Sequence, residues 1–239
     1  MKYSTEQSAS ERRSPICVSV NAGYRLWSRS YDSDANPLLA LEQRTLSDML
    51  EGVAGRVFLD VACGTGRWMA EAAARGARCF GVDLNTGMLS AAQRKLPLDG
   101  RLARADALDL PFPDRCAGMA VCSFALGYIR PRARLISELG RTVERGGTVL
   151  VSDLHPHARR NGWRRSFRSG SEVFEIESDS WTIEELMNAG SASGLRLRKI
   201  VEPHFGHPEH LIMKKAGKAS LIDEVSSVPA ILAVVWARL

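Results

Sequence analysis

The sequence lacks any hydrophobic run long enough to cross a membrane, which takes about 18–20 apolar residues. The best candidate, Val228–Trp236, is a run of nine residues that contains Pro229, and it is typical of a buried strand. The polar stretch Met1–Pro15 has no apolar core and does not resemble a secretion signal. These absences predict a cytoplasmic protein with no membrane span.

Cysteine is also scarce, and no two cysteines form a CxxC pair. The chain has an odd number of them, five: Cys17, Cys63, Cys79, Cys116 and Cys122. This usage excludes a disulfide framework and a structural zinc knuckle. We therefore expect no resident metal.

Charge of one sign is only slightly in excess, since 32 Lys and Arg face 27 Asp and Glu, a net charge of +5. Residues 155–170 carry five Arg and no acid, so the rest of the chain balances at 27 against 27. With 45% hydrophobic and 25% charged residues, the composition excludes disorder, collagen and coiled coil. We expect a disordered tail over residues 1–15 and a single domain over residues 16–239. No pattern indicates an oligomeric state.

Short apolar runs alternate with segments of helical periodicity. This rhythm predicts βαβ units and a mostly parallel sheet. Strands are expected at 56–61, 78–83, 101–105, 117–124, 148–153, 195–201 and 230–237, and helices at 36–50, 67–75, 86–95, 132–144 and 182–192. Asn36 and Thr182 are expected helix caps, while Gly76, Pro97 and Gly146-Gly147 are expected helix ends.

The rhythm breaks over residues 154–180. Structureless runs of this length in compact domains are typical of lids and binding loops. Phe167, Val173, Phe174 and Ile176 alternate enough to indicate a hairpin. We expect this insertion to cover the site.

A glycine loop follows the first strand of the alternating pattern, in Val57-Phe-Leu-Asp-Val-Ala-Cys-Gly-Thr-Gly66. Gly64 and Gly66 allow a sharp turn and a close backbone approach to a ligand at a helix N-terminus. Asp83 ends the next strand, where a carboxylate can accept both ribose hydroxyls. A dinucleotide fold needs a third glycine where this chain has Met69, so a nicotinamide-dependent oxidoreductase is disfavoured.

Taken together, these motifs resemble those of class I S-adenosylmethionine (SAM)-dependent methyltransferases, with the ubiquinone/menaquinone-type small-molecule group the most similar. Asp60-Val-Ala-Cys-Gly-Thr-Gly66 resembles their first motif and Gly81-Val-Asp83 their second. The resemblance also includes Ala103–Pro113, Cys122-Ser-Phe124, Glu144–Val151 and the N-terminal segment Tyr24–Asp32. It covers residues 24–153 and implies a Rossmann-like α/β fold. The implied sheet has seven strands in the order 3-2-1-4-5-7-6, with the last strand antiparallel and a helical cap over residues 20–50.

The resemblance implies SAM as the cofactor and S-adenosylhomocysteine as its product. Asp60 would anchor the loop, Gly64 and Gly66 would admit the methionine moiety, and Asp83 would bind the ribose. Asp106 and Ala107 would bind the adenine. The alternative interpretation of Asp106 is an aspartate that stabilises a turn or caps a helix. The remaining implied cofactor contacts are Tyr24, Tyr31, Ala62, Leu84, Met88 and Cys122, of which the two tyrosines are equally well explained as core aromatics.

The acceptor is less well defined. The fourth strand ends in Cys122-Ser-Phe124 and lacks the Asn/Asp-Pro-Pro-aromatic motif of amino methyltransferases, so nucleic acid is disfavoured. His155 follows a strand end and is the candidate general base, with a solvated loop histidine as the alternative. His204, His207 and His210 have a metal-like spacing, but Gly206 and Pro208 argue against a helix there. A histidine that contacts the substrate, such as His207, is the better interpretation.

The insertion is rich in arginine and aromatic residues. Its candidate substrate contacts are His157, Trp163, Arg164 and Arg165. This composition suits a carboxylate or phosphate on a small acceptor, or RNA, or simply a solvated charged strand. The sequence therefore favours methyl transfer to oxygen or carbon of a small-molecule acceptor. RNA, thiol or metalloid methylation and a non-catalytic SAM-binding module remain the alternatives.

Overall fold

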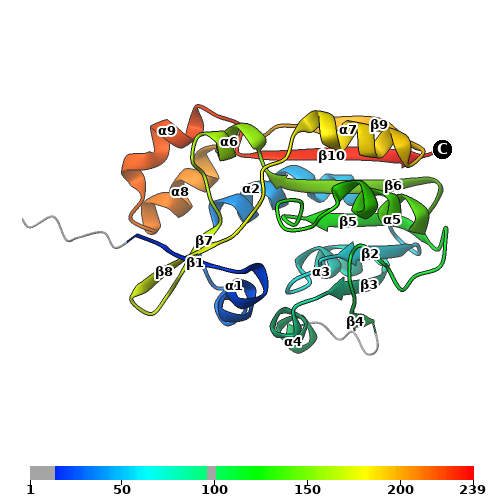
Figure 1. The fold of residues 1–239 in the computed structure, drawn as a ribbon, viewed down its shortest axis with the longest axis horizontal. Helices are drawn as coiled ribbons and strands as arrows, with labels where there is room; N and C mark the ends of the chain where they lie inside the picture. The colour runs from blue at the N-terminus through cyan, green and yellow to red at the C-terminus, as the bar shows by residue number, and fades with distance from the viewer. Residues whose placement is uncertain (1–13, 96–100) are drawn as a thin grey trace, which may run out of the picture.

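The computed structural model describes residues 14–95 and 101–239, and in it a seven-stranded sheet is the centre of the molecule (Figure 1). Its strand order is β4-β3-β2-β5-β6-β10-β9. If the seven strands of this sheet are numbered 1 to 7 along the chain, as in the expected sheet, the observed order is 3-2-1-4-5-7-6. The last strand, β10, pairs antiparallel with both neighbours, so the topology expected from the motifs is confirmed.

The sheet's strands lie where the sequence predicts them, to within a few residues. They are β2 (Val57–Val61), β3 (Arg78–Asp83), β4 (Leu102–Arg104), β5 (Ala117–Ser123), β6 (Val143–Leu154), β9 (Leu195–Val201) and β10 (Ile231–Arg238). Side chains alternate between two buried layers, as strands covered on both faces require. Phe58 and Met119 pack on one face, and Leu59 and Ala120 on the other.

Helices cover both faces of this sheet. The expected helices are present as α2 (Pro37–Leu46) with the short η1 (Ser47–Leu50), α3 (Arg67–Ala74), α4 (Thr86–Lys95), α5 (Arg132–Thr142) and α7 (Ile183–Ala192). Asn36 accepts from the Leu38 and Leu39 amides, and Thr182 from the Glu185 amide, so both predicted caps are confirmed. None of the helices over residues 14–95 and 101–239 could span a bilayer. Residues 1–13 of the expected tail 1–15, and the helix end expected at Pro97, lie outside the described residues.

A second sheet has three strands in the order β1-β8-β7. The expected hairpin is β7 (Ser166–Ser169) and β8 (Glu172–Ile176), and β1 (Ile16–Val18) adds to it in parallel. Figure 1 shows this sheet, with α1 (Val20–Trp27), at the end of the main sheet where the parallel strands finish. The N-terminal segment and the insertion are therefore one structure beside the strand ends.

Two sequence expectations are wrong. Strand β6 begins at Val143, so Gly146 and Gly147 lie inside it rather than ending a helix. A Cβ on Gly147 would lie 2.8 Å from the Gly118 carbonyl oxygen, so the glycine permits β5 and β6 to approach closely.

The second error is α8 (His207–Lys215), which is a regular helix despite Gly206 and Pro208. Proline is tolerated in a first helical turn, where backbone N–H groups have no intrahelical acceptor. Glu209 accepts from the Gly206 amide and holds Arg44 of α2 through two hydrogen bonds of 3.0 and 2.9 Å. The remaining short helices are α6 (Pro156–Arg160), η2 (Ala219–Leu221) and α9 (Ile222–Ser226).

Candidate active site

A cavity of about 270 Å³ lies at the carboxyl ends of β2, β3 and β5. Ligands in α/β folds bind at this end of the strands. Among the sequence-predicted cofactor residues, all but two line the cavity: Tyr24, Tyr31, Asp60, Ala62, Gly64, Asp83, Leu84, Met88, Asp106 and Ala107.

The two exceptions are Gly66 and Cys122. Gly66 caps α3 in the left-handed conformation, with φ +74°, so it shapes the loop from outside the cavity lining. Cys122 is fully buried in the sheet core, because its β5 position faces the layer of α5 and α7. Burial also raises the pKa of the Cys122 thiol above its ordinary range.

The glycine loop is held open toward the cavity. Gly64 has φ +54°, and a Cβ built on it would meet no atom within 4 Å. Ala62 and Phe124 end β2 and β5 with φ of +56° and +51°, a conformation that non-glycine residues rarely adopt and that clusters at ligand sites. Met69 packs with its sulfur against Gly81, which explains why the third glycine of a dinucleotide motif is absent.

Asp83 joins the loop to the following strand. Its Oδ2 accepts from the Gly64 amide and its Oδ1 from the Asn85 amide, both at 2.8 Å. Burial raises the pKa of Asp83, and these two amide donors oppose that shift. Each carboxylate oxygen can accept a further hydrogen bond, and Asp83 lines the cavity, so a vicinal diol can be bound there.

Asp60 lies beneath the loop and is 2% exposed. It accepts from the Met69 amide at 3.2 Å, which ties the strand end to α3. Burial raises the pKa of Asp60 to about 7, and the Arg67 charge opposes this shift. Asp106 is exposed at the other end of the cavity, and one of its oxygens accepts from the Leu108 amide. The turn role considered for Asp106 is therefore present beside its place in the cavity lining.

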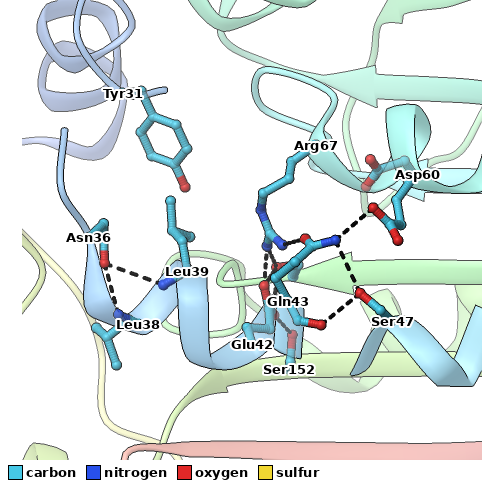
Figure 2. Close-up of polar contacts among 12 residues, drawn as sticks. Tyr31, Asn36, Leu38, Leu39, Glu42, Gln43, Ser47, Asp60, Arg67 and Ser152 are labelled. Atoms are coloured by element: carbon cyan, nitrogen blue, oxygen red, sulfur yellow. Dashed lines mark hydrogen bonds and ion pairs between the residues drawn. The ribbon is translucent and has the colours of Figure 1, made fainter. Parts of the chain in front are cut away.

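Sequence reasoning missed a polar network at the cavity edge, which we call the Glu42 network and which comprises Glu42, Arg67, Ser123 and Ser152. Figure 2 labels Glu42, Arg67 and Ser152 of this network. Glu42 of α2 has no exposed surface and accepts from the Ser123 hydroxyl at 2.8 and 2.9 Å. It also accepts from Ser152 and pairs with Arg67. Arg67 and Ser123 line the cavity, so Glu42 orients both from behind.

One signal in the sequence could have revealed this network. Glu42 follows Leu38 by four residues and directly succeeds Leu41, so it lies on the apolar stripe of α2. A charged residue on such a stripe is rarely buried unless it is paired.

Contacts from the N-terminal segment close the cofactor side of the cavity. Thr65 donates to Asp32 at 2.7 Å, and Lys95 pairs with the same carboxylate at 2.8 Å. Asn85 donates to the backbone and side-chain oxygens of Asn21 at 2.9 Å. These contacts hold α1 over the glycine loop.

His155 is buried and is not part of the cavity lining. The His155 side chain caps α6, because its Nδ1 accepts from the His157 amide at 3.0 Å. Its Nε2 lies 3.0 Å from Glu202 Oε1. Burial lowers the pKa of His155. Both ring nitrogens have hydrogen-bond partners, so neither has a free lone pair that could remove a proton from an acceptor. In this geometry His155 stabilises the start of α6.

The predicted substrate residues divide among several environments, and none of them lines the cavity. His157 and His207 are exposed, and Trp163 stacks on Phe205 with ring centroids 5.6 Å apart. Arg164 lines a second cavity on the far side of Tyr128. Arg165 is buried directly behind the aromatic wall of the first cavity.

The histidines of the metal-like spacing have other partners. His204 bonds the Ser226 carbonyl and His210 the Ser226 hydroxyl, at 3.1 and 2.8 Å. Within residues 14–95 and 101–239, no three His, Cys, Asp or Glu side chains gather as a metal site requires.

Comparison with known proteins agrees with this arrangement. Residues 59–151 match the model of a family described as "Methyltransferase domain". A demethylmenaquinone methyltransferase from Clavibacter sepedonicus is 37% identical over 103 residues, which are 42% of each chain. The chain thus spans less than half the length of this curated relative. These matches confirm the resemblance that the motifs indicate.

Solved structures share the fold over most of the chain. An S-adenosylmethionine-dependent methyltransferase from Mesorhizobium loti aligns with a TM-score of 0.66 and 24% identity, covering 85% of this chain and all of that one. A geranyl diphosphate C-methyltransferase from Streptomyces coelicolor, in complex with geranyl diphosphate and S-adenosylhomocysteine, aligns with a TM-score of 0.61 and 19% identity. That alignment covers 84% of this chain and 82% of the other. The fold is that of class I methyltransferases.

Proposed function

We propose that this chain, whose residues 59–151 match a methyltransferase domain and whose fold is that of class I methyltransferases, is a SAM-dependent methyltransferase. One observation carries the proposal: the Gly64 amide donates a hydrogen bond of 2.8 Å to the Asp83 carboxylate, and both residues line a cavity that Asp106 also lines. A glycine loop, a diol-binding carboxylate and a second acid at the far end suit a nucleoside with a charged tail.

The residues present fit SAM. Asp83 has an acceptor lone pair on each oxygen for the ribose, and Gly64 leaves space for a close backbone approach. Bound SAM supplies an electrophilic methyl group through its sulfonium charge. The chain then needs only to orient the acceptor and exclude water, for which the aromatic wall of Tyr24, Tyr31 and Tyr128 is suited.

We further propose a small-molecule acceptor, methylated on oxygen or carbon and carrying negative charge. The relatives named demethylmenaquinone methyltransferase support a small aromatic acceptor. The family match ends at residue 151, before the insertion, so acceptor identity does not carry over from it. We assign the acceptor walls to the cap 20–50 and the insertion 154–180 of a single domain 16–239, supported by the pairing of β1 with β8. Five free cysteines support a reducing, cytoplasmic location.

Titration calorimetry with SAM tests the cofactor assignment. The wild type is expected to bind, and Asp83→Ala to bind at least about tenfold more weakly, because two charge-assisted hydrogen bonds are lost. Asp109→Ala is the matched control, since this exposed aspartate lies near Asp106 but outside the cavity lining. Equal SAM affinity in Asp83→Ala and the wild type would overturn the assignment.

Transfer of a labelled methyl group from SAM to a panel of quinols, phenols, thiols and RNA tests the acceptor class. Methylation of a phenol or quinol is the expected result. Methylated RNA would replace the small-molecule proposal. SAM binding without turnover on any acceptor would favour a non-catalytic module.

A further inference from the structure

The guanidinium of Arg165 is buried without an anionic partner. The residue is 3% exposed, and its Nε and Nη1 have no hydrogen-bond partner among the described residues. Its Cζ lies 4.4 Å from the Phe124 ring centroid and 5.3 Å from that of Trp27. Aromatic faces attract a cation but do not satisfy its N–H donors. An unpaired buried charge is costly, so the site is incomplete as it stands.

The nearby buried carboxylate does not complete it. Asp153 accepts from the Gly127 amide at 2.8 Å and the Leu154 amide at 2.6 Å, and forms no ion pair with Arg165 within the described residues. Arg159, which also approaches Asp153, donates to the Ser178 hydroxyl and carbonyl instead. The Asp153 charge favours the charged form of Arg165 and raises its pKa, but it leaves the guanidinium Nε and Nη1 without a hydrogen-bond acceptor among the described residues.

Three phenols stand between this charge and the cavity. Tyr24, Tyr31 and Tyr128 all line the cavity, and the Tyr24 ring lies 5.5 Å from Tyr128, edge to face, and 6.3 Å from Tyr31. The Tyr128 hydroxyl is buried beside the Tyr24 hydroxyl, which acts on it as a donor, and its own proton has no acceptor among the described residues. Tyr31 accepts from Arg165 Nη2 at 3.4 Å, which leaves its own proton free to donate. We call these three tyrosines and Arg165 the Arg165 cluster.

The Tyr24 and Tyr128 hydroxyls remain donors at neutral pH. Burial raises the pKa of Tyr24 well above its ordinary value, and burial raises the pKa of Tyr128 to about 12. In front of a permanent cation, these two hydroxyls present O–H groups and positive charge to the cavity. The carboxylates of Asp60, Asp83 and Asp106 line the same cavity.

We propose that the Arg165 cluster binds an anionic oxygen of a planar acceptor, with the Tyr31 and Tyr128 hydroxyls in contact with that oxygen and Arg165 as a positioning residue behind them. The aromatic walls favour a flat ring, and the charge favours its ionised form. When a phenol binds, its O–H bond breaks, the electron pair stays on oxygen, and the proton leaves to solvent water. The location of this site beside the methyl donor rests on the proposed function.

The second cavity does not compete for this role. It lies on the far side of Tyr128 and is lined by Glu175, Glu177 and Asp179 as well as Arg164. Arg164 lies 3.9 Å from Glu175, so its charge is already opposed there. An anionic oxygen is therefore favoured on the Arg165 side of Tyr128 only.

Spectrophotometric titration of 4-nitrophenol tests the proposal, because only its phenolate absorbs visible light. With S-adenosylhomocysteine present to prevent turnover, the wild type is expected to bind the probe and to lower its apparent pKa by about one unit, a tenfold change in ionisation. Arg165→Met is expected to abolish this shift, and Arg165→Lys to restore part of it. Tyr128→Phe is expected to weaken binding about tenfold. Arg164→Met, at the exposed neighbouring arginine, is the matched control and should leave the shift intact.

Several outcomes would overturn the proposal: no binding by the wild type, preference for the neutral phenol, or an unchanged shift in Arg165→Met. Circular dichroism checks folding, and Tyr128→Phe with Arg165→Lys carries the test if Arg165→Met does not fold. Competition by benzoate would extend the site to carboxylates, and its failure would restrict the site to phenolates, both within the proposal. Phenolate binding without SAM binding would refute the proposed function alone, whereas SAM binding without a phenolate preference would refute this site alone.

Discussion

Two arginines lie beside the same cavity, the half-buried Arg67 and the buried Arg165, and their surroundings differ. Arg67, in the Glu42 network, pairs with a carboxylate and donates to Gln43 at 2.7 Å. Arg165 has aromatic faces, one long bond to Tyr31 and two N–H groups without partners. A buried charge with a full set of hydrogen-bond partners holds parts of a fold together. A buried charge that lacks partners lowers stability, and such a residue is expected where a bound ligand supplies the missing acceptors.

The comparison also separates two kinds of residue around the site. The Glu42 network joins α2 to the ends of β5 and β6, so its loss should lower the free energy of unfolding. Within the Arg165 cluster, Arg165 itself forms no ion pair among the described residues, so its loss should affect binding more than stability. Stability measurements can test both statements.

The largest expected effect is that of Glu42→Ala. This change leaves Arg67 without its carboxylate and two serine hydroxyls without their acceptor. We expect the free energy of unfolding to fall by about 3–5 kcal/mol, as for other broken buried pairs. Urea denaturation measures this loss, with Glu51→Ala, at an exposed glutamate, as the control that should change it by less than about 0.5 kcal/mol. A loss below about 1 kcal/mol for Glu42→Ala would remove the distinction between the two arginines.

The buried carboxyl group of Asp60, which accepts one hydrogen bond from the Met69 amide, should make the stability of the protein depend on pH. Its folded pKa of about 7 lies above the ordinary 3.8, so the folded state holds a proton that the unfolded state releases. The free energy of unfolding should therefore fall as pH rises from about 4 to 7, by up to about 4 kcal/mol from this group, and then level off. Asp60→Asn should flatten that slope, as measured by urea denaturation across the pH range. Asp109→Asn, at an exposed aspartate, should retain the slope, and an equal slope in Asp60→Asn and the wild type would contradict the prediction.

Arg165→Met and Arg67→Met form a matched pair for stability. Removing Arg67 leaves Glu42 buried without a cation, and we expect a loss of about 3 kcal/mol. Removing Arg165 eliminates buried N–H donors that lack acceptors, but it also removes the contacts of the guanidinium with aromatic rings. We therefore expect the free energy of unfolding to stay the same or to rise by about 1 kcal/mol. Thermal and urea unfolding of the two variants measure the difference. Similar losses in both would show that Arg165 is a structural residue.

The smallest expected effect lies outside both clusters, at the cap of α7. Thr182→Ala removes the hydrogen bond to the Glu185 amide, 3.0 Å long, and should lower the free energy of unfolding by about 1 kcal/mol. Thr182→Ser keeps the acceptor oxygen and should recover most of this loss. Because the cap and Arg165 share no hydrogen-bond partner, the loss should be the same in the Arg165→Met background.

The cofactor side of the fold was largely predictable from local sequence. Strand β3 and helix α4 have the predicted bounds, because turn residues and apolar periodicity act over a few neighbouring positions. Helix α8 was not predictable, since Gly206 and Pro208 argue against it locally. It is stabilised by a contact between Glu209 and Arg44, which are 165 positions apart.

The sequence by itself determined the position of most strands, the glycine loop and the position of Asp83, because each depends on residues that are close in the chain. The order of the strands followed from the resemblance to a known family. Only the tertiary structure decided which buried charges are paired. Glu42 meets Ser152 across 110 positions, and Arg165 meets Tyr31 across 134. The insertion was recognisable as basic and aromatic, but its five arginines have different roles because burial, not composition, decides whether a charge finds water, a carboxylate or a ligand.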